Sequence, residues 1–320
     1  MLTLGINGVK KIKVLIFGSN GLVGKSIVRK MSEEDYFDVI PSNRDSLDLF
    51  DFIETSKFIS KLRPDVVINA AAKVGGIMAN NIDRFDFIME NLKINMNILE
   101  SLKPYPETKV INLGSSCIYP LNIENPINES SIMDGKLEST NSPYAMAKLT
   151  AIEIGDAMSK QFGHKILNLM PTNLYGPGDN FNPTSSHVIP GMIYKFHEAK
   201  NQKITEVNLW GDGTPLREFL YVDDLSEAII FLLKENKEDY LINIGSSEEI
   251  SIKELSSIIK NITKFEGSVN FDDSKPNGIM RKYLDSSLIT SYGWKPATSL
   301  NKGLEKTYKW FLDNFEYIRS

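Results

Sequence analysis

The side chains with the clearest potential for chemistry occupy two short segments. The first, Gly114-Ser-Ser-Cys-Ile-Tyr-Pro120, holds a serine pair and Cys117, the only cysteine among 320 residues. The second, Tyr144-Ala-Met-Ala-Lys148, opens a helical pattern, so its i, i+4 spacing places the tyrosine and the lysine on one helix face. An ammonium group there is expected to lower the phenol pKa and prepare the tyrosine to protonate a carbonyl that receives a hydride. Ser115 or Ser116 would hydrogen-bond the same carbonyl oxygen.

The Tyr-x-x-x-Lys pattern is weak by itself, because the chain contains a second copy at Tyr105-Pro-Glu-Thr-Lys109. Prolines at positions 104 and 106 are incompatible with a helix there, so its tyrosine and lysine would not share a face. The alternative for Tyr144 and Lys148 is an exposed helix pair without a catalytic role.

Cys117 and His187 are candidates for moving protons on carbon. A thiol and an imidazole, with ordinary pKa values of about 8.5 and about 6.5, both exchange protons near neutral pH. Placed on opposite sides of a sugar ring, such a pair would invert a carbon next to a ketone. The alternative for the cysteine is a small buried apolar residue. His187 ends a polar loop, where it would cover a pocket, whereas His164 and His197 are expected to be structural or solvated.

A glycine-rich loop, Gly18-Ser-Asn-Gly21-Leu-Val-Gly24, follows an apolar run and enters a helical stretch. Glycines at this spacing allow backbone N–H groups to approach a pyrophosphate at a helix N-terminus, so the loop predicts a dinucleotide cofactor. The next strand ends in Pro41-Ser-Asn-Arg-Asp45, where Arg44 would pair with a 2′-phosphate. This favours NADP, with a solvated loop arginine as the alternative.

These side chains require a scaffold of alternating strands and helices. Strands are expected at residues 13–17, 38–41, 65–70, 109–114 and 165–170, each followed by a helix-length segment such as 22–31 or 85–102. Such alternation predicts an α/β, Rossmann-like, doubly wound parallel sheet. A polar loop follows at 178–186, a turn at 210–213, a strand returning to the main sheet at 241–244, and a final helix at 300–314.

Two lobes follow from this pattern. Residues 1–180, with a return segment at about 217–248, are predicted to form the NADP-binding Rossmann domain. Residues 181–216 and 249–320 are predicted to form a smaller, discontinuous α+β lobe that binds the substrate.

Composition excludes several classes of protein. The net charge of −5 gives no global basic field for nucleic acid or an acidic membrane. One cysteine forms no intramolecular disulfide, which suits a reducing compartment. The first 11 residues place their charges after a short apolar stretch, the wrong order for a signal peptide, and no run of about 18 apolar residues occurs. We therefore predict a soluble cytoplasmic protein. Among the candidate site residues none is expected to hold a metal ion.

At these residues the chain resembles the extended short-chain dehydrogenase/reductases that act on nucleotide sugars, and within them the GDP-L-fucose synthase family. The resemblance runs from about Lys13 to Phe315. Its most specific strings are Ala70-Ala-Ala-Lys-Val-Gly-Gly-Ile77, Gly114-Ser-Ser-Cys-Ile-Tyr-Pro120, Pro171-Thr-Asn-Leu-Tyr-Gly-Pro177, Ser186-His-Val-Ile-Pro190 and Trp210-Gly-Asp-Gly-Thr-Pro-Leu-Arg-Glu-Phe-Leu-Tyr-Val-Asp-Asp224.

The resemblance implies an enzyme that epimerises GDP-4-keto-6-deoxy-D-mannose at carbons 3 and 5 and then reduces carbon 4 with NADPH, usually as a homodimer. It gives Ser115, Tyr144 and Lys148 the reductase role, and Cys117 and His187 the roles of epimerase base and acid. The implied substrate-binding residues are His187, Lys195, Trp210, Arg217 and Lys282. The expected cofactor contacts are Gly18, Ser19, Asn20, Gly21, Leu22, Val23, Gly24, Asn43, Arg44, Asp48, Leu113, Gly114, Ser116, Lys148, Pro171, Thr172, Asn173 and Leu174.

Several alternatives stay open. Arg217 and Lys195 would hold a diphosphate or form surface salt bridges, and Trp210 would stack on a base or pack in the core. Residues 121–134 diverge locally from the family and would alter which sugar fits. The competing activities are those of an enzyme for another GDP-4-keto-deoxy sugar (colitose-like or heptose-like), a plain 4-reductase or a dehydratase. A dehydratase is disfavoured because the serine pair has no neighbouring carboxylate. The remaining alternative is a cofactor-binding regulator without catalysis.

Overall fold

A computed structural model describes residues 10–275 and 277–319, so most of the segment behind the signal-peptide prediction lies outside the described residues. Its centre is a sheet of six strands that all run parallel. In spatial order these are β2 (Phe37–Ser42), β1 (Ile12–Phe17), β3 (Val66–Asn69), β4 (Lys109–Leu113), β5 (Ile166–Pro171) and β9 (Leu241–Ile244). The interior strands are apolar and buried, as a sheet covered on both faces requires.

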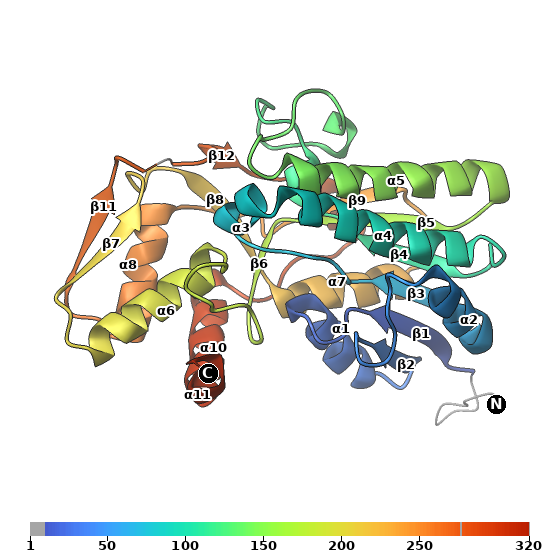
Figure 1. The fold of residues 1–320 in the computed structure, drawn as a ribbon, viewed down its shortest axis with the longest axis horizontal. Helices are drawn as coiled ribbons and strands as arrows, with labels where there is room; N and C mark the ends of the chain where they lie inside the picture. Colours follow the sequence, from blue (N-terminus) through green and yellow to red (C-terminus); the bar gives the residue numbers. More distant parts are fainter. Residues whose placement is uncertain (1–9, 276, 320) are drawn as a thin grey trace.

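Helices cover both faces of this sheet (Figure 1). On one face, an apolar cluster joins the sheet to α1 (Leu22–Ser32), α7 (Val222–Lys234) and the short α9 (Ser287–Ser291). On the other, a second cluster joins it to α2 (Phe52–Leu62), α4 (Arg84–Leu102) and α5 (Ser142–Phe162). The short α3 (Ile77–Ile82) precedes α4. The arrangement confirms the predicted doubly wound α/β fold.

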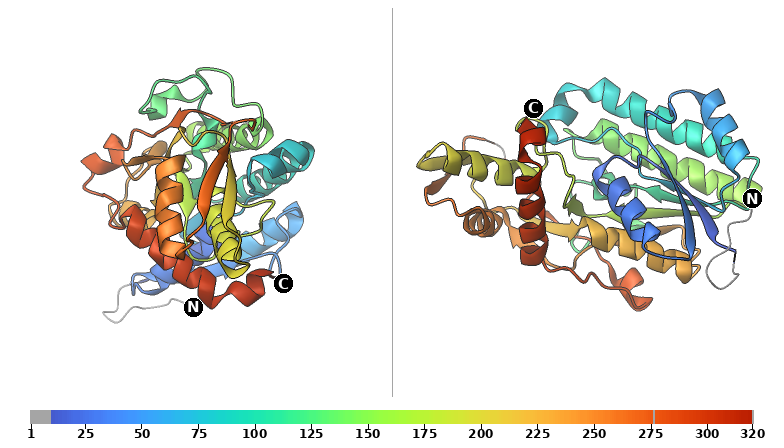
Figure 2. Two further views of the ribbon diagram at one scale, coloured as in Figure 1. Left: turned by 90° about the vertical axis from the view of Figure 1, so that its left-hand side faces the viewer. Right: turned by 90° about the horizontal axis from the view of Figure 1, so that it is seen from below.

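A smaller set of elements lies at one end of this sheet (Figures 1 and 2). It has its own apolar cluster, built largely from α6 (Val188–Asn201), α8 (Ile252–Thr263), α10 (Leu300–Asp313) and the parallel pair β7 (Glu206–Trp210) and β11 (Ser268–Asp272). A mixed sheet of β10 (Glu249–Ser251), β8 (Leu216–Tyr221) and β12 (Arg281–Lys282), with β6 (Asn173–Tyr175) also paired to β8, lies beside it. The last helix is α11 (Phe315–Arg319).

The predicted strands agree with the structure to within one residue at each end, and the return of residues 241–244 to the main sheet is confirmed. One prediction was wrong: β5 is followed by β6 and a loop, because its exit pairs with β8 before α6 begins. The second Tyr-x-x-x-Lys copy is not helical, as its prolines predicted. Within the described ranges, none of the helices has the length and hydropathy of a bilayer-crossing segment.

Candidate active site

The glycine-rich loop has the shape of a cradle for a phosphate group. Gly18 has φ +76°, and a Cβ there would lie 2.7 Å from the backbone of Ala70. A Cβ on Gly24 would lie 2.1 Å from the carbonyl oxygen of Gly18, so only glycine allows α1 to start this close to the loop. Gly21 caps α1 without a side-chain hydrogen bond, which leaves the first-turn N–H groups to a ligand such as a pyrophosphate. Ser19, Asn20, Leu22 and Val23 complete this loop and first turn.

The turn after β2 is tied to this loop through the Ser19 N–H, which donates to the carbonyl of Ser42 at 3.0 Å. Asn43 accepts bonds from the Asp45 and Ser46 N–H groups, and Asp48 accepts one from the Phe50 N–H. Arg44 is exposed and forms no ion pair with any described residue. Its place beside the cradle fits a 2′-phosphate contact, which stays a prediction.

The ends of β4 and β5 supply the other expected cofactor contacts. The Lys148 ammonium donates to the Leu113 carbonyl at 2.7 Å, and a Cβ on Gly114 would lie 2.1 Å from the Met170 side chain. Ser116 and Pro171 are buried, and Leu174 packs against the apolar core. The Thr172 hydroxyl and the Asn173 amide both donate to the Glu218 carbonyl. The side chains of Thr172 and Asn173 are therefore engaged within the protein.

Tyr144 and Lys148 lie in the first two turns of α5, and the ammonium nitrogen is 5.8 Å from the centre of the phenol ring. Burial lowers the pKa of Lys148 to about 8. Burial, with a smaller contribution from the neighbouring Cys117, raises the pKa of Tyr144 above its usual value. The expected lowering of the phenol pKa was wrong for the protein chain alone, because desolvation dominates at the phenol and raises its pKa. A raised pKa keeps the phenol protonated, as a proton donor requires.

Cys117 lies in a single 3₁₀ turn, Ser116–Ile118, directly after β4. The Ser115 hydroxyl oxygen caps this turn by accepting the Cys117 N–H at 3.3 Å. Cys117 is only 7 % exposed, and this burial raises the pKa of its thiol. Three contributions partly oppose that rise: the charge of the nearby Lys282, a hydrogen bond with Ser115, and the charge of Lys148. Cys117 packs in none of the four apolar clusters of the described residues. Its electrostatic neighbours are those of a reactive group.

His187 precedes α6 and makes no side-chain capping bond there. The residue as a whole is exposed, yet desolvation by the surrounding protein lowers the pKa of its imidazole. The loop that carries it is fixed by the Gly76 N–H, which donates to the Ser185 carbonyl at 3.0 Å. No hydrogen bond joins His187 to Cys117 in the described residues. A base and an acid that act on opposite faces of a sugar do not need a hydrogen bond to each other. His164 and His197 are buried and hydrogen-bonded, so both are structural, as predicted.

Two cations from distant parts of the sequence lie side by side. Lys282 of β12 is in register with Arg217 of β8. The pKa values of both are lowered by burial, and in Lys282 the neighbouring Cys117 opposes this while Arg217 adds to it. Neither forms an ion pair within the described residues, where Arg217 donates only to the carbonyl of Leu216. The surface-salt-bridge alternative is therefore not observed, and the pair suits an anion such as a diphosphate.

The two other predicted substrate residues are exposed. Trp210 ends β7 and is 52 % exposed, so the core-packing alternative was wrong and the indole is free to stack on a base. Lys195 is exposed on α6 and has no ion-pair partner in the described ranges. The structure brings Ser115, Cys117, Tyr144, Lys148 and Lys282 into one electrostatic cluster, while Lys195 and Trp210 lie on the smaller lobe.

The divergent segment 121–134 is docked against the strand that carries Lys282. The Ile127 N–H donates to the Tyr283 carbonyl at 2.8 Å, and the Tyr283 N–H donates to the Asn125 side chain at 2.8 Å. The prediction that this segment affects sugar choice remains a prediction, with its location now defined.

Sequence reasoning missed two residues near the catalytic side chains. Phe87 of α4 meets the Tyr144 ring edge-on, with ring centres 6.4 Å apart. Glu138 influences the pKa of Lys282 and accepts bonds from the Thr140 and Asn141 N–H groups just before α5. The contacts of Phe87 with Tyr144 and of Glu138 with Lys282 join distant segments, and nothing in the local sequence indicates them.

Comparison with known proteins gives one consistent result. The family model "NAD dependent epimerase/dehydratase family" matches residues 14–245. GDP-L-fucose synthase 1 of Arabidopsis thaliana is 45% identical over 95% of this chain and 94% of its own, whereas GDP-L-colitose synthase of Yersinia pseudotuberculosis is 35% identical over 94% and 98%. The solved structure of a GDP-L-fucose synthetase from Naegleria fowleri bound to NADP is 29% identical, covers 99% of this chain and 97% of its own, and has a TM-score of 0.87. The chain therefore belongs to the NAD dependent epimerase/dehydratase family, and within it to the group that contains the GDP-L-fucose synthases.

Proposed function

We propose that this protein converts GDP-4-keto-6-deoxy-D-mannose to GDP-L-fucose, by epimerisation at carbons 3 and 5 followed by NADPH-dependent reduction of the 4-keto group. The observation that carries the proposal is the cluster in which the buried Cys117 and Lys148 lie beside the half-buried Tyr144 and Lys282. Several GDP-L-fucose synthases are 42% to 46% identical to this chain and the GDP-L-colitose synthase is 35% identical, which supports this sugar over the alternatives.

In the epimerisation, the Cys117 thiolate removes a proton from a carbon beside the ketone, and the electron pair of that C–H bond forms an enolate. Tyr144 and Ser115 stabilise the enolate oxygen by donating hydrogen bonds. His187 returns a proton to the opposite face of the same carbon, which inverts it. The raised pKa of the buried thiol makes its thiolate a strong base, and Lys282 and Lys148 limit that rise so that the thiolate remains accessible.

In the reduction, NADPH supplies a hydride when it is bound. Tyr144 gives its proton to the oxygen of carbon 4, and the Lys148 ammonium stabilises the phenolate that remains. The Gly18–Gly24 cradle and the turn of Arg44 hold the cofactor in residues 1–180 with the return segment 217–248. Arg217 and Lys282 hold the diphosphate of the substrate, Trp210 stacks on its base, and Lys195 adds a positive charge, which assigns residues 181–216 and 249–320 mainly to the substrate.

The test is product identification by NMR. The protein is incubated with NADPH and, separately, with GDP-4-keto-6-deoxymannose, a GDP-4-keto-dideoxy sugar and a GDP-4-keto-heptose in deuterated water. The proposal requires deuterium at carbons 3 and 5 and GDP-L-fucose as the reduced product. Reduction without deuterium at these carbons would indicate a plain 4-reductase, and turnover of another sugar alone would overturn the substrate assignment.

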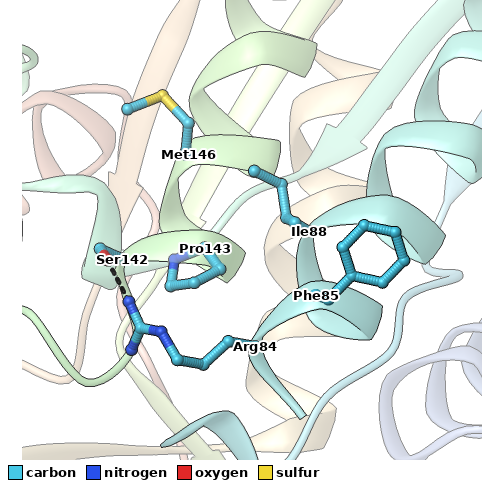
Figure 3. A pocket seen from close by; sticks show the side chains of 6 residues that line it. All are labelled: Arg84, Phe85, Ile88, Ser142, Pro143 and Met146. Carbon is cyan, nitrogen blue, oxygen red and sulfur yellow. Dashed lines mark hydrogen bonds between the residues drawn. The ribbon is translucent and has the colours of Figure 1, made fainter.

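The protein works as a homodimer in the cytoplasm in this proposal. Apolar side chains gather on the outer face of α4 and α5, where Phe85 is 72 % exposed, and Met146 and Met96 are also exposed. A shallow cavity of about 400 Å³ between these helices is lined by Phe85, Ile88, Pro143 and Met146, with Arg84 bonded to Ser142 at its edge (Figure 3). A second copy of this face would bury these side chains.

The dimer is tested by light scattering after size-exclusion chromatography. Phe85→Glu is expected to give monomers, and Ile53→Glu, which changes an exposed apolar residue on α2, is expected to leave the dimer intact. A monomeric wild-type protein, or a dimeric Phe85→Glu variant, would contradict the dimer or its location.

A further inference from the structure

Glu218 is a fully buried carboxylate beside the candidate active site that has no cationic partner among the described residues. Its side chain is 0 % exposed on β8, next to Arg217. One carboxylate oxygen accepts the N–H of Ser247 at 2.9 Å, and the other accepts the N–H of Leu284 at 3.1 Å. Such bonds from backbone amides compensate for the burial of a charge, which is otherwise very costly.

These bonds join segments that are far apart in sequence. Ser247 lies in the turn from β9 to β10, and Leu284 follows Lys282 of β12 by two residues. A Cβ on Gly245 would lie 2.2 Å from the carboxylate, so the turn is also shaped around it. The main-chain carbonyl of Glu218 accepts the side chains of Thr172 and Asn173. One residue thus connects the exit of β5, the β9–β10 turn and the strand of Lys282.

The strand of Lys282 needs such an anchor. β12 is only two residues long, and its backbone places Lys282 in register with Arg217, whose charge acts on the Lys282 ammonium. Two like charges without an ion-pair partner repel each other, so the backbone of this short strand must be held from elsewhere. Because successive side chains of a strand point to opposite faces, Glu218 holds Leu284 from the side of β8 away from Arg217, and it does not neutralise the cations.

We propose that Glu218 is a positioning residue that fixes Lys282 beside Arg217 and Cys117, so that the two cations bind the diphosphate of a nucleotide sugar. This inference rests on the proposed function for the identity of the ligand. In this role, the buried Glu218 carboxylate keeps the diphosphate site aligned with the Cys117 thiol, which removes a proton from the substrate.

Glu218→Gln tests the proposal, since the amide is the same size but presents an N–H toward one of the two backbone donors. The Kd for GDP, used as the probe, is measured by calorimetry and is expected to rise by about 10-fold, the scale of one lost charge-assisted contact. The Kd for NADPH should stay within about twofold, because the glycine cradle is untouched. The part of the ultraviolet absorbance change that is lost in Cys117→Ser reports on the Cys117 thiolate, since the chain has no other cysteine. Its titration midpoint should rise as Lys282 moves away.

The matched control is Glu248→Gln, which makes the same chemical change at an exposed position in the adjacent turn. Should Glu218→Gln fail to fold, Gly245→Ala provides a second route, because its Cβ displaces the intact carboxylate. In a Lys282→Ala background, Glu218→Gln should weaken GDP binding little further, which a merely structural role would not predict.

A folded Glu218→Gln variant with wild-type GDP affinity and an unchanged thiolate titration would overturn the inference, as would equal losses in the presence and absence of Lys282. These outcomes are distinguishable from failure of the proposed function. If only the proposed function failed, the wild-type protein would bind GDP but would not convert the 4-keto sugar. The comparison of GDP affinities between variants would still decide the role of Glu218. Absence of GDP binding by the wild type would overturn both.

Discussion

Gly76→Ala is predicted to slow proton exchange at carbon through His187, without touching either catalytic group. Gly76 has φ −64° and ψ 177°, a backbone conformation that alanine adopts without strain. A Cβ there would nevertheless lie 2.6 Å from the carbonyl oxygen of Ser186, the residue directly before His187. The effect of this substitution is therefore a steric push on one peptide group.

The size of the push follows from the geometry. Real Cβ contacts essentially never fall below 3.0 Å, so the carbonyl must move by about 0.4 Å or more, at a place where Gly76 and Ser186 are both half-buried. A misplacement of about 1 Å in an active site costs up to about 100-fold in rate. A shift of this smaller size should cost about 3- to 10-fold in the step that uses His187.

The assay is deuterium incorporation from solvent at the carbons that flank the ketone, followed by NMR without NADPH. The exchange rate should fall while the Kd for NADPH stays unchanged, because the added Cβ would meet only Ser185 and Ser186 and no residue of the cradle. Gly135→Ala is the control, since its Cβ would approach only the Pro120 side chain, at 3.2 Å. Exchange at the wild-type rate in a folded Gly76→Ala variant would refute the steric argument for His187.

Three further predictions concern the catalytic cluster. Cys117→Ser should slow deuterium incorporation at the flanking carbons by about 10²-fold or more while leaving NADPH binding intact, and undiminished exchange would remove the thiol from the base role. Tyr144→Phe should lower the reduction rate by a similar factor while exchange partly persists, and equal loss of both would mean that the two steps share the phenol fully. Reduction should weaken as the pH rises through about 8, because Lys148 loses its proton there, whereas exchange should increase with pH as the thiol ionises. Parallel pH profiles would contradict this assignment.

The fold was predictable because its signals are local. Short β-rich runs that alternate with amphipathic stretches place the strands to within one residue, and prolines correctly excluded the second Tyr-x-x-x-Lys copy. The exit of β5 was not predictable, since β6 is defined by its pairing with β8, about 45 residues later.

In the candidate site, too, features with local signals were predictable from the sequence, and features that depend on distant residues were not. Residue types at fixed spacing located Ser115, Cys117, Tyr144 and Lys148, because a parallel sheet brings the ends of neighbouring strands together. The spacing did not give the pKa of Tyr144, which depends on desolvation by many residues. The role of Glu218 was equally hidden, since its partners Ser247 and Leu284 become neighbours only when the chain folds.

One cluster serves two reactions because the reactions need opposite properties from its members. Proton removal needs a basic thiolate, whereas reduction needs a phenol that keeps its proton until the carbonyl oxygen accepts it. Burial raises the pKa of both Cys117 and Tyr144, which strengthens the one as a base and preserves the other as a donor. The two lysines then distinguish the thiol from the phenol by their effect on the thiol pKa. Lys282 and Lys148 act against the rise in the thiol pKa, whereas desolvation dominates at the phenol, so the lysines favour ionisation of the thiol over ionisation of the phenol.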